Sequence, residues 1–256
     1  VSVDQLESTT HGIIAQLKGK VTHRRYKAAT IFVDHYSDAS FIHLQETLTS
    51  EDTIRAKEAF EAWSRTNGIS QVQHYHCDNG RFTDNAWTID ARKKGQTVTF
   101  CGVNAHFQNG RAEKRIRDLR ESARTSLHHA MSRWPGVVDL HLWPYALRYA
   151  NDVHNLMPDK NGNSRLQKFA KVPIQCNLNN FHSFGCTVYA LDSKLAAGQK
   201  IPHWNSRSRV GINLGFSLRH ARNVALVLNT TTGTVSPQYH VKYDDFFTSV
   251  SPTAGN

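Results

Sequence analysis

The pattern of apolar and polar positions over the first 100 residues predicts a mixed sheet with helices. Short apolar runs predict strands, and apolar residues at helical spacing predict helices. The predicted strands cover residues 1–4, 28–33, 41–44, 72–77 and 98–100, and the predicted helices cover 50–67 and 85–94. Residues 7–27 are polar and basic, which predicts a loop or hairpin. This order of elements is typical of an α/β domain.

A long amphipathic helix is predicted from about Asn109, a good N-cap residue, to Ser132. Glu113 lies in its first turn, and Arg117, Arg120 and Arg124 share the face of Glu113. A carboxylate that heads a row of guanidinium groups suits a site that handles a metal and a polyanion. The alternative is a solvated face on which Glu113 pairs with Arg117 at the favoured i, i+4 spacing. The predicted buried stripe of this helix is Ala112, Ile116, Leu119, Ala123, Leu127 and Ala130.

The rest of the chain predicts a change of architecture. Another helix is predicted to start near Trp143-Pro144, with proline in its first turn. The composition then shifts to Asn, Lys and Gly over residues 158–181, which predicts a linker. Short strands with glycine punctuation follow and predict a small β-barrel-like domain. We therefore expect domains at 1–157 and 182–250, joined by the linker, with a tail at 251–256.

The distribution of charge along the chain indicates what kind of partner it binds. The net charge of the 256 residues is +10. Residues 1–100 carry 12 basic and 12 acidic residues, whereas residues 101–256 carry 19 and 9, so the whole excess lies in the second part. A basic part beside a neutral part favours a polyanion such as nucleic acid, although the charge could serve solubility alone.

Several classes of protein are disfavoured. No apolar run approaches the length of a membrane span, and no signal peptide opens the sequence, so we expect no membrane partner. No Cys-x-x-Cys pair occurs, so we expect no zinc in this fragment and free thiols in a reducing compartment. The four scattered cysteines are Cys77, Cys101, Cys176 and Cys186.

Three carboxylates are the candidate chemistry. Asp4 lies on the first predicted strand, Asp78 ends a later strand, and Glu113 lies on the long helix, so the three could converge at one sheet edge. Oxygen ligands favour Mg²⁺ or Mn²⁺, and a pair of such ions can activate an attacking oxygen at phosphorus. Asp78 could instead be a simple turn former, since it begins Asp-Asn-Gly. Asp34 competes as a ligand, but we favour a turn role for it beside Ser37.

The chain resembles the integrase of copia-type LTR retrotransposons, which are related to retroviral integrases. The resemblance rests on TIFVDHYS (residues 30–37), HCDNGRF (76–82) and QNGRAEKR (108–115). Further matches are FGCTVY (184–189) and RVGINLGF (209–216). Only residues 157–181 match poorly. The combination of Asp-Asn-Gly with Gln-Asn-Gly-x-x-Glu is specific, whereas either half alone is weak.

The resemblance implies a fold and an activity. It implies an RNase H-like five-stranded sheet with flanking helices, and a catalytic and metal-binding triad of Asp4, Asp78 and Glu113 that holds two Mg²⁺ or Mn²⁺ ions. The implied reaction is DNA strand transfer, in which the 3′-hydroxyl of the element's DNA attacks a target phosphodiester. It also implies double-stranded DNA partners (element ends and target), a homo-oligomer, and action in the nucleus after a cytoplasmic particle stage. The residues expected to contact DNA are Gln108, Asn109, Lys114, Arg117, Arg120 and Arg124.

Two departures keep alternatives open. Between Asp78 and Glu113 lie 34 residues, one fewer than the family's usual spacing. A deletion in the loop after Phe82 would be harmless, but one in the strand near Val98 would not. The family's upstream zinc domain is absent from this sequence. A decayed or domesticated DNA-binding derivative and a ribonuclease H-type nuclease therefore remain alternatives.

Overall fold

The computed structural model describes residues 1–15, 22–102, 106–173, 178–217, 220–221 and 223–250. The chain divides into two compact units. The first unit comprises Val1–Gly12, Arg25–Glu121 and Ala150–Cys176, and the second comprises Ile13–Arg24, Ser122–Tyr149 and Asn177–Asn256. Two long helices, α3 (Gly110–Arg133) and α4 (Trp143–Leu156), each contribute residues to both units.

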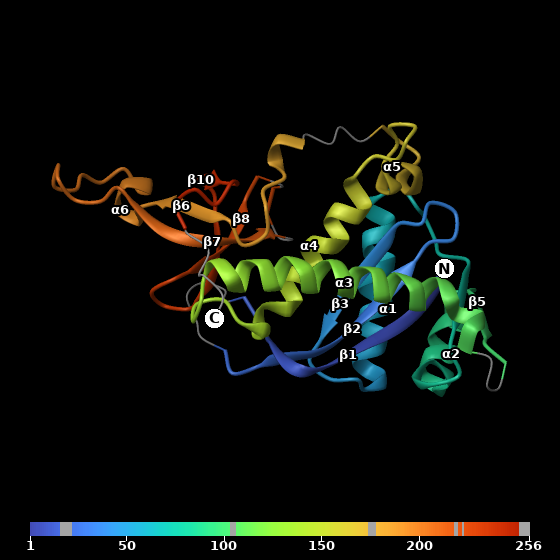
Figure 1. Cartoon of the computed structure of the whole chain (residues 1–256). Coiled ribbons are helices and arrows are strands. Elements are labelled where there is room, and N and C mark those ends of the chain that lie inside the picture. Colours follow the sequence, from blue (N-terminus) through green and yellow to red (C-terminus); the bar gives the residue numbers. More distant parts are fainter. Residues whose placement is uncertain (16–21, 103–105, 174–177, 218–219, 222, 251–256) are drawn as a thin grey trace. The chain divides into compact units, whose positions relative to one another are not determined.

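The first unit is built on a mixed five-stranded sheet in the order β3-β2-β1-β4-β5 (Figure 1). Strands β2 and β3 pair antiparallel, whereas β1 pairs parallel with β4 and β4 pairs parallel with β5. This confirms the predicted α/β architecture. The strands are β1 (Ser2–Ile13), β2 (Arg25–Val33), β3 (Ser40–Gln45), β4 (His74–Cys77) and β5 (Thr97–Phe100).

Helices flank this sheet, and local sequence sets their ends. Helix α1 (Ser50–Thr66) begins after Thr49, whose side chain accepts a hydrogen bond from the backbone N–H of Asp52. Helix α2 (Asn85–Lys93) is capped in the same way by Asp84. The shorter helical segments of the chain are η1 (Arg81–Thr83), η2 (His106–Asn109), η3 (Leu140–Leu142), α5 (Arg165–Ala170) and η4 (Leu178–Asn180).

Aromatic packing fills the space between α1 and the sheet. Phe32 of β2 stacks on Phe60 of α1, with ring centroids 4.5 Å apart and planes 5° from parallel. Tyr75 of β4 meets both rings edge-on, and Trp87 of α2 meets Tyr75 in the same geometry. All four side chains are almost fully buried, so they form the centre of the first unit's core.

The predicted extent of the first strand needs correction. The first strand reaches Ile13, well beyond Asp4, because polar residues alternate with half-buried ones along it and it pairs with neighbours on both sides. The segment 158–181, predicted as a linker, contains α5, which begins after the cap Ser164. Phe169 of α5 stacks on Trp63 of α1 with centroids 4.8 Å apart. The domain boundaries as a whole remain a prediction.

The second unit contains an antiparallel five-stranded sheet, which fits the predicted β-rich C-terminal domain. Its order is β10-β6-β7-β8-β9. Gly185 lets this sheet approach α3, because a Cβ there would lie 2.4 Å from the Cβ of Ala130. The indole N–H of Trp134 donates to the carbonyl of Gly185 over 2.9 Å. The elements are β6 (Thr187–Leu191), α6 (Ser193–Ala196), β7 (Ser208–Phe216), β8 (Ala225–Asn229), β9 (Val235–Gln238) and β10 (Val241–Asp244).

The amphipathic pattern of α3 is confirmed. All six apolar positions of its predicted stripe are buried. Strand β5 also pairs with β4 without interruption, from His74 opposite Thr97 to Cys77 opposite Phe100. The short spacing between Asp78 and Glu113 therefore does not disturb this pairing. Among the described residues, no helix is both long enough and apolar enough to cross a membrane.

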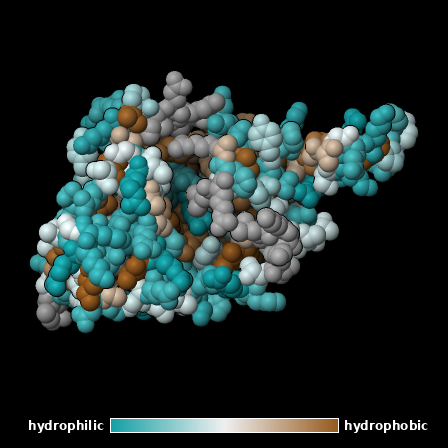
Figure 2. Space-filling model, turned by 180° about the vertical axis from the view of Figure 1, so that it is seen from behind, coloured by the Kyte–Doolittle hydropathy of each residue, from teal (hydrophilic) through white to brown (hydrophobic). Residues whose placement is uncertain are grey.

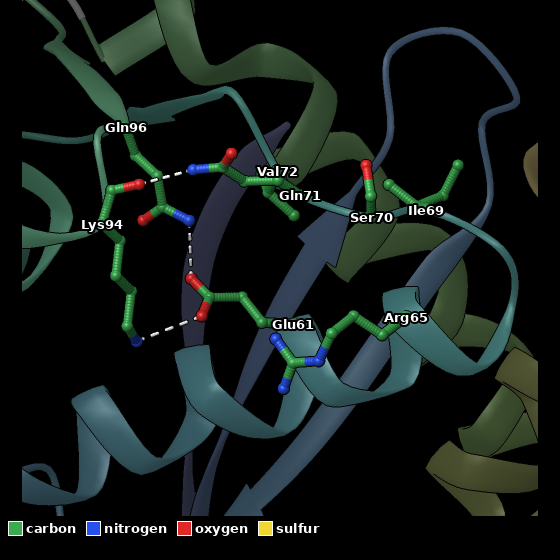
Figure 3. A pocket seen from close by; sticks show the side chains of 8 residues that line it. All are labelled: Glu61, Arg65, Ile69, Ser70, Gln71, Val72, Lys94 and Gln96. Atoms are coloured by element: carbon green, nitrogen blue, oxygen red, sulfur yellow. Dashed lines mark hydrogen bonds and ion pairs between the residues drawn. The ribbon is translucent and has the colours of Figure 1, made fainter.

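A buried lysine joins α1, α2 and β5, and nothing in the sequence pattern predicted it. The Lys57 side chain has no exposed surface, and its ammonium lies 3.0 Å from Glu61 and 2.6 Å from Asp90. Gln96 and Lys94 also donate to Glu61, as Figure 3 shows. Burial alone would raise the pKa of both carboxyls. The hydrogen bonds outweigh burial and hold the pKa of Glu61 and of Asp90 below the usual range.

We predict that Lys57→Ala lowers the free energy of unfolding by about 3 kcal/mol, because it leaves the carboxylates of Glu61 and Asp90 without their buried cation. Urea denaturation followed by circular dichroism measures this change. The matched control is Arg55→Ala on the same helix, whose side chain is 57% exposed in its ion pair with Glu51. The control should cost less than about 1 kcal/mol. Equal losses in the two variants would contradict a structural role for the buried cluster.

Candidate active site

The parallel pairing of β1 with β4 brings two of the predicted carboxylates together. Val3 lies opposite Cys77 in the register of the two strands. The next residues along the chain are Asp4, within β1, and Asp78, just past the end of β4, so these two aspartates are neighbours on adjacent strands. Both side chains are half-buried. The register thus accounts for the convergence that the sequence predicted for these two residues.

A buried asparagine fastens the start of α3 to the same strand. The side-chain amide of Asn109 donates to the carbonyl of Val3 over 3.0 Å, and Asn109 has no exposed surface. Glu113 follows Asn109 by one helical turn, so the two residues share a face of the helix. Glu113 is therefore held beside the strand that carries Asp4. Asn109 is expected to contact DNA, and that contact stays a prediction; in the structure its buried side chain positions α3.

Cys101 lies beside the end of β4. Its backbone N–H donates to the carbonyl of Cys77 over 3.0 Å, just beyond β5. Burial raises the pKa of the Cys101 thiol, and the negative charges of Asp78, Glu113 and Asp4 act in the same direction. The sequence analysis did not single out this cysteine.

Among the described residues, the three carboxylates do not lie close enough together to form a complete set of metal ligands. Within the described parts of the chain, no group of three or more His, Cys, Asp or Glu side chains lies close enough to hold a metal ion. One oxygen of Asp4 accepts the backbone N–H of Gln5 over 2.7 Å. The donor set still fits a hard divalent cation, because it consists of carboxylate oxygens alone. Asp4, Asp78 and Glu113 are the residues that would hold such an ion.

His76, which the sequence analysis did not single out, lies next to Cys101. One ring nitrogen of His76 lies 2.9 Å from the hydroxyl of Thr99. The other lies 3.2 Å from the backbone oxygen of Gln108 and 3.7 Å from the sulfur of Cys101. The Gln108 side-chain oxygen accepts the N–H of Gly102 over 2.7 Å. Gln108, expected to contact DNA, therefore also closes the base of the loop before α3.

Asp34 takes the turn role that we favoured for it. One of its oxygens accepts hydrogen bonds from the backbone N–H groups of Tyr36 and Ser37 and from the hydroxyl of Ser37, over 2.7 to 3.1 Å. Such bonds stabilise a tight turn between strands. The guanidinium of Arg111 donates to the carbonyl of His35 over 2.7 Å and ties this turn to α3.

A second buried cation lies close to Glu113 in α3. Arg115 is 7% exposed and forms an ion pair with Asp38 over 2.6 Å. Arg115 also donates to Nδ1 of His154 over 2.9 Å. Arginine can only donate, so Nδ1 is the acceptor, and Nε2 carries the proton that reaches the Asp38 carbonyl over 3.1 Å. Arg115 directly precedes Ile116, which belongs to the buried stripe. That position was the signal in the sequence that could have revealed this cluster.

The other predicted DNA-contacting residues lie on the surface. Lys114, Arg117, Arg120 and Arg124 are exposed, and none has an ion-pair partner among the described residues. No ion pair joins Glu113 to Arg117 among the described residues, and the exposure of the arginines fits a solvated face as well as a DNA-binding one. Contact of these side chains with DNA stays a prediction.

We predict that the free energy of unfolding falls as pH drops from 6.5 toward 4, because of His154. Burial, and then the charge of Arg115, lower the pKa of His154 to about 4. The unfolded chain binds a proton near pH 6.5. Between pH 6.5 and 4 the unfolded state therefore binds a proton at His154 that the folded state does not bind. The free energy of unfolding falls as a result. The loss is on the order of 3 kcal/mol, since one pKa unit is about 1.4 kcal/mol.

Urea denaturation of the wild type and of His154→Gln at pH 7 and pH 4.5 measures the effect. Glutamine keeps a polar group but does not titrate, so the variant should lose less stability than the wild type between the two pH values. The same pH dependence in both proteins would remove His154 as the cause.

Comparison with known proteins was made by sequence and by structure. No protein-family model matches the chain, and no curated protein matches its sequence. One similar solved structure is the simian T-cell lymphotropic virus intasome in complex with PP2A regulatory subunit B56 gamma, with 17% identity and a TM-score of 0.49 over 94% of this chain and 77% of that chain.

Two further structures are of the HTLV-2 integrase catalytic core domain in complex with magnesium. The trimeric form has 17% identity and a TM-score of 0.45, and the dimeric form has 15% and 0.46. Each covers 66% of this chain and 93% of that chain. At these identities and TM-scores, the likeness does not bear on function.

Proposed function

We propose that this chain is a polynucleotidyl transferase that joins DNA strands with the help of divalent cations, as in the integration of a copia-type retrotransposon. The observation that carries the proposal is the register of β1 and β4, which makes Asp4 and Asp78 neighbours, together with the hydrogen bond from Asn109 to Val3, which ties the start of the helix of Glu113 to the same strand. The motif resemblance around Asp78 and Glu113 supports the same conclusion independently of geometry.

The residues of the chain have distinct roles in this proposal. The three carboxylates hold the cations and take no part in proton transfer. A pair of Mg²⁺ or Mn²⁺ ions held there would activate the attacking 3′-hydroxyl and stabilise the leaving oxygen at phosphorus. Asn109 keeps Glu113 beside the strand of Asp4. Where ends are trimmed first, water takes the place of the hydroxyl.

The exposed arginines of α3 supply the electrostatic attraction to DNA. Arg117 and Arg120 follow Glu113 on the same helix face, and neither is neutralised by a carboxylate among the described residues. Such side chains bind phosphates, which positions a duplex without reading its sequence. The resemblance adds that the protein acts as a homo-oligomer on element ends and target DNA, in the nucleus after a cytoplasmic particle stage.

We predict that Glu113→Gln abolishes joining chemistry while DNA binding is retained, because glutamine keeps the shape of the side chain but is a poor metal ligand. The assay is gel analysis of a branched DNA that mimics an integrated end, with Mg²⁺ or Mn²⁺. Glu121→Gln makes the same change on the same helix two turns away and serves as the matched control. It should leave resolution of the branch unchanged.

The outcomes separate the alternatives. Metal-dependent resolution that is lost only in Glu113→Gln supports the transferase. A folded, DNA-binding protein that never resolves the branch would favour a decayed or domesticated DNA-binding derivative. Cleavage of an RNA–DNA hybrid without joining of two DNAs would favour a ribonuclease H-type nuclease.

We predict that Arg117→Ala and Arg120→Ala each weaken duplex binding and flatten its salt dependence by about one unit on a log–log plot, because each removes one phosphate contact. Fluorescence anisotropy of a labelled duplex over a range of salt concentrations measures both effects. Arg55→Ala is the control, since Arg55 is exposed but already paired with Glu51. An unchanged slope in the α3 variants would exclude this face from the DNA interface.

A further inference from the structure

A basic extension projects from the sheet of the second unit. Strand β6 ends at Leu191, which lies opposite Ser208, the first residue of β7. The backbone N–H of Asp192 donates to the carbonyl of Arg207 over 2.9 Å and closes the base of the extension. Residues 192–207 thus form a closed excursion between two paired strands, with α6 near its start (Figure 1).

A tight turn exposes a tryptophan on this extension. The backbone N–H of Asn205 donates to the carbonyl of Pro202 over 3.1 Å, as in a β-turn with proline near its start. Trp204 is the third residue of that turn, and its side chain is 99% exposed. The chain has five tryptophans, and the other four are buried or half-buried. Both faces of this large aromatic ring are therefore accessible to a partner.

The segment that carries Trp204 is basic. Residues 192–209 contain Lys194, Lys200, Arg207 and Arg209 and one acidic residue, Asp192, at the base of the extension. All four cations are exposed, and none forms an ion pair within the described residues. In the space-filling view, hydrophilic residues cover most of this extension (Figure 2). The ring therefore stands in a positive field that attracts polyanions.

The sheet face next to the extension continues the same combination. Tyr189 of β6 lies opposite Val210 of β7 and opposite Lys242 of β10. Residues directly opposite each other point to the same face of a sheet, so these three side chains form one row. All three are exposed. An aromatic ring again stands beside an unpaired cation.

We propose that this extension is a binding site for single-stranded nucleic acid, in which Trp204 stacks on an unpaired base and the neighbouring lysines and arginines hold the phosphates. Base stacking on an aromatic side chain and an electrostatic hold on the backbone are the two components of single-strand binding. The site lies outside the carboxylate cluster and needs no metal, so it does not depend on the function proposed above.

Single-stranded rather than duplex nucleic acid follows from the geometry of the ring. In a duplex, the faces of each base are covered by its neighbours in the stack, so a protruding ring finds no free face to cover. Lysines and arginines alone would suffice for a duplex, because duplex phosphates are read without base contact. The exposed indole adds affinity only where bases are unpaired.

Tryptophan fluorescence of the full chain tests the proposal directly. The protein is titrated with a thymidine 20-mer in EDTA at low salt, and Trp204→Phe is titrated alongside. We expect the oligonucleotide to quench the emission of the wild type and to leave that of Trp204→Phe nearly unchanged, because the remaining tryptophans lie elsewhere. Wild-type emission that is unaffected at saturation, or equal quenching in both proteins, would overturn the proposal.

Anisotropy with labelled single-stranded and duplex 20-mers provides the second readout. Trp204→Ala should weaken single-strand binding about 5- to 100-fold, since stacking on one base is worth about 1–3 kcal/mol. It should change duplex binding less than about twofold. The matched control is Phe246→Ala, an 88% exposed ring that follows two aspartates, which should change neither affinity. Equal loss on both nucleic acids, or no loss, would show that Trp204 serves a different partner such as a protein.

A third variant separates the charges from the ring. Lys200→Gln combined with Arg207→Gln should flatten the salt dependence of single-strand binding by about 0.7 for each lost phosphate contact. In EDTA, the oligonucleotide should quench the tryptophan emission of Glu113→Gln as it quenches that of the wild type. A failure of strand joining therefore leaves this proposal intact, and a failure of quenching leaves the catalytic proposal intact.

Discussion

The parallel pairing of β1 with β4 is the constraint on which the candidate active site depends. It makes Asp4 and Asp78 neighbours, because each directly follows one member of the register pair Val3 and Cys77. A slip of one residue would turn every side chain of β1 to the other face of the sheet and remove Asp4 from the cluster. The hydrogen bond from Asn109 to Val3 extends this constraint to the helix that carries Glu113.

Two buried, ion-paired cations hold the elements of the first unit together. Lys57 joins α1 to α2, and Arg115 joins α3 to α4 and to the turn before β3. Burying an ion costs free energy unless partners surround it, and both cations here have several. A buried cation keeps its partners in only one arrangement of the helices that carry them. Such cations therefore position the helices more uniquely than apolar packing alone would.

The second unit carries the features of the proposed single-strand site. The close approach of Gly185 to Ala130 packs its sheet against the later part of α3. Its extension then places one fully exposed ring among cations that no carboxylate neutralises. The arginines of α3 offer charge alone, whereas the extension combines charge with a stacking surface. The two features therefore suit duplex and unpaired nucleic acid respectively.

The sequence by itself determined the parts of this protein that depend on local pattern. The apolar stripe of α3, the exposed arginines opposite it, the turn at Asp34 and the strands of the first sheet follow from spacing and turn chemistry. The excess of positive charge in the second part of the chain was also visible there. Glu113 and Asp78 could be named because each stands in a short motif with its own signature.

Only the tertiary structure decided what depends on distant partners. Asn109 looks like a helix cap, yet its amide bonds a residue 106 positions away, and no local pattern encodes such a contact. Arg115 and Lys57 read as surface residues until their partners on other elements bury them. The length of β1 and the packing of α5 follow from neighbours in space in the same way. The exposure of Trp204 is the converse case, because an indole in the sequence reads as core until the fold leaves it without a neighbour.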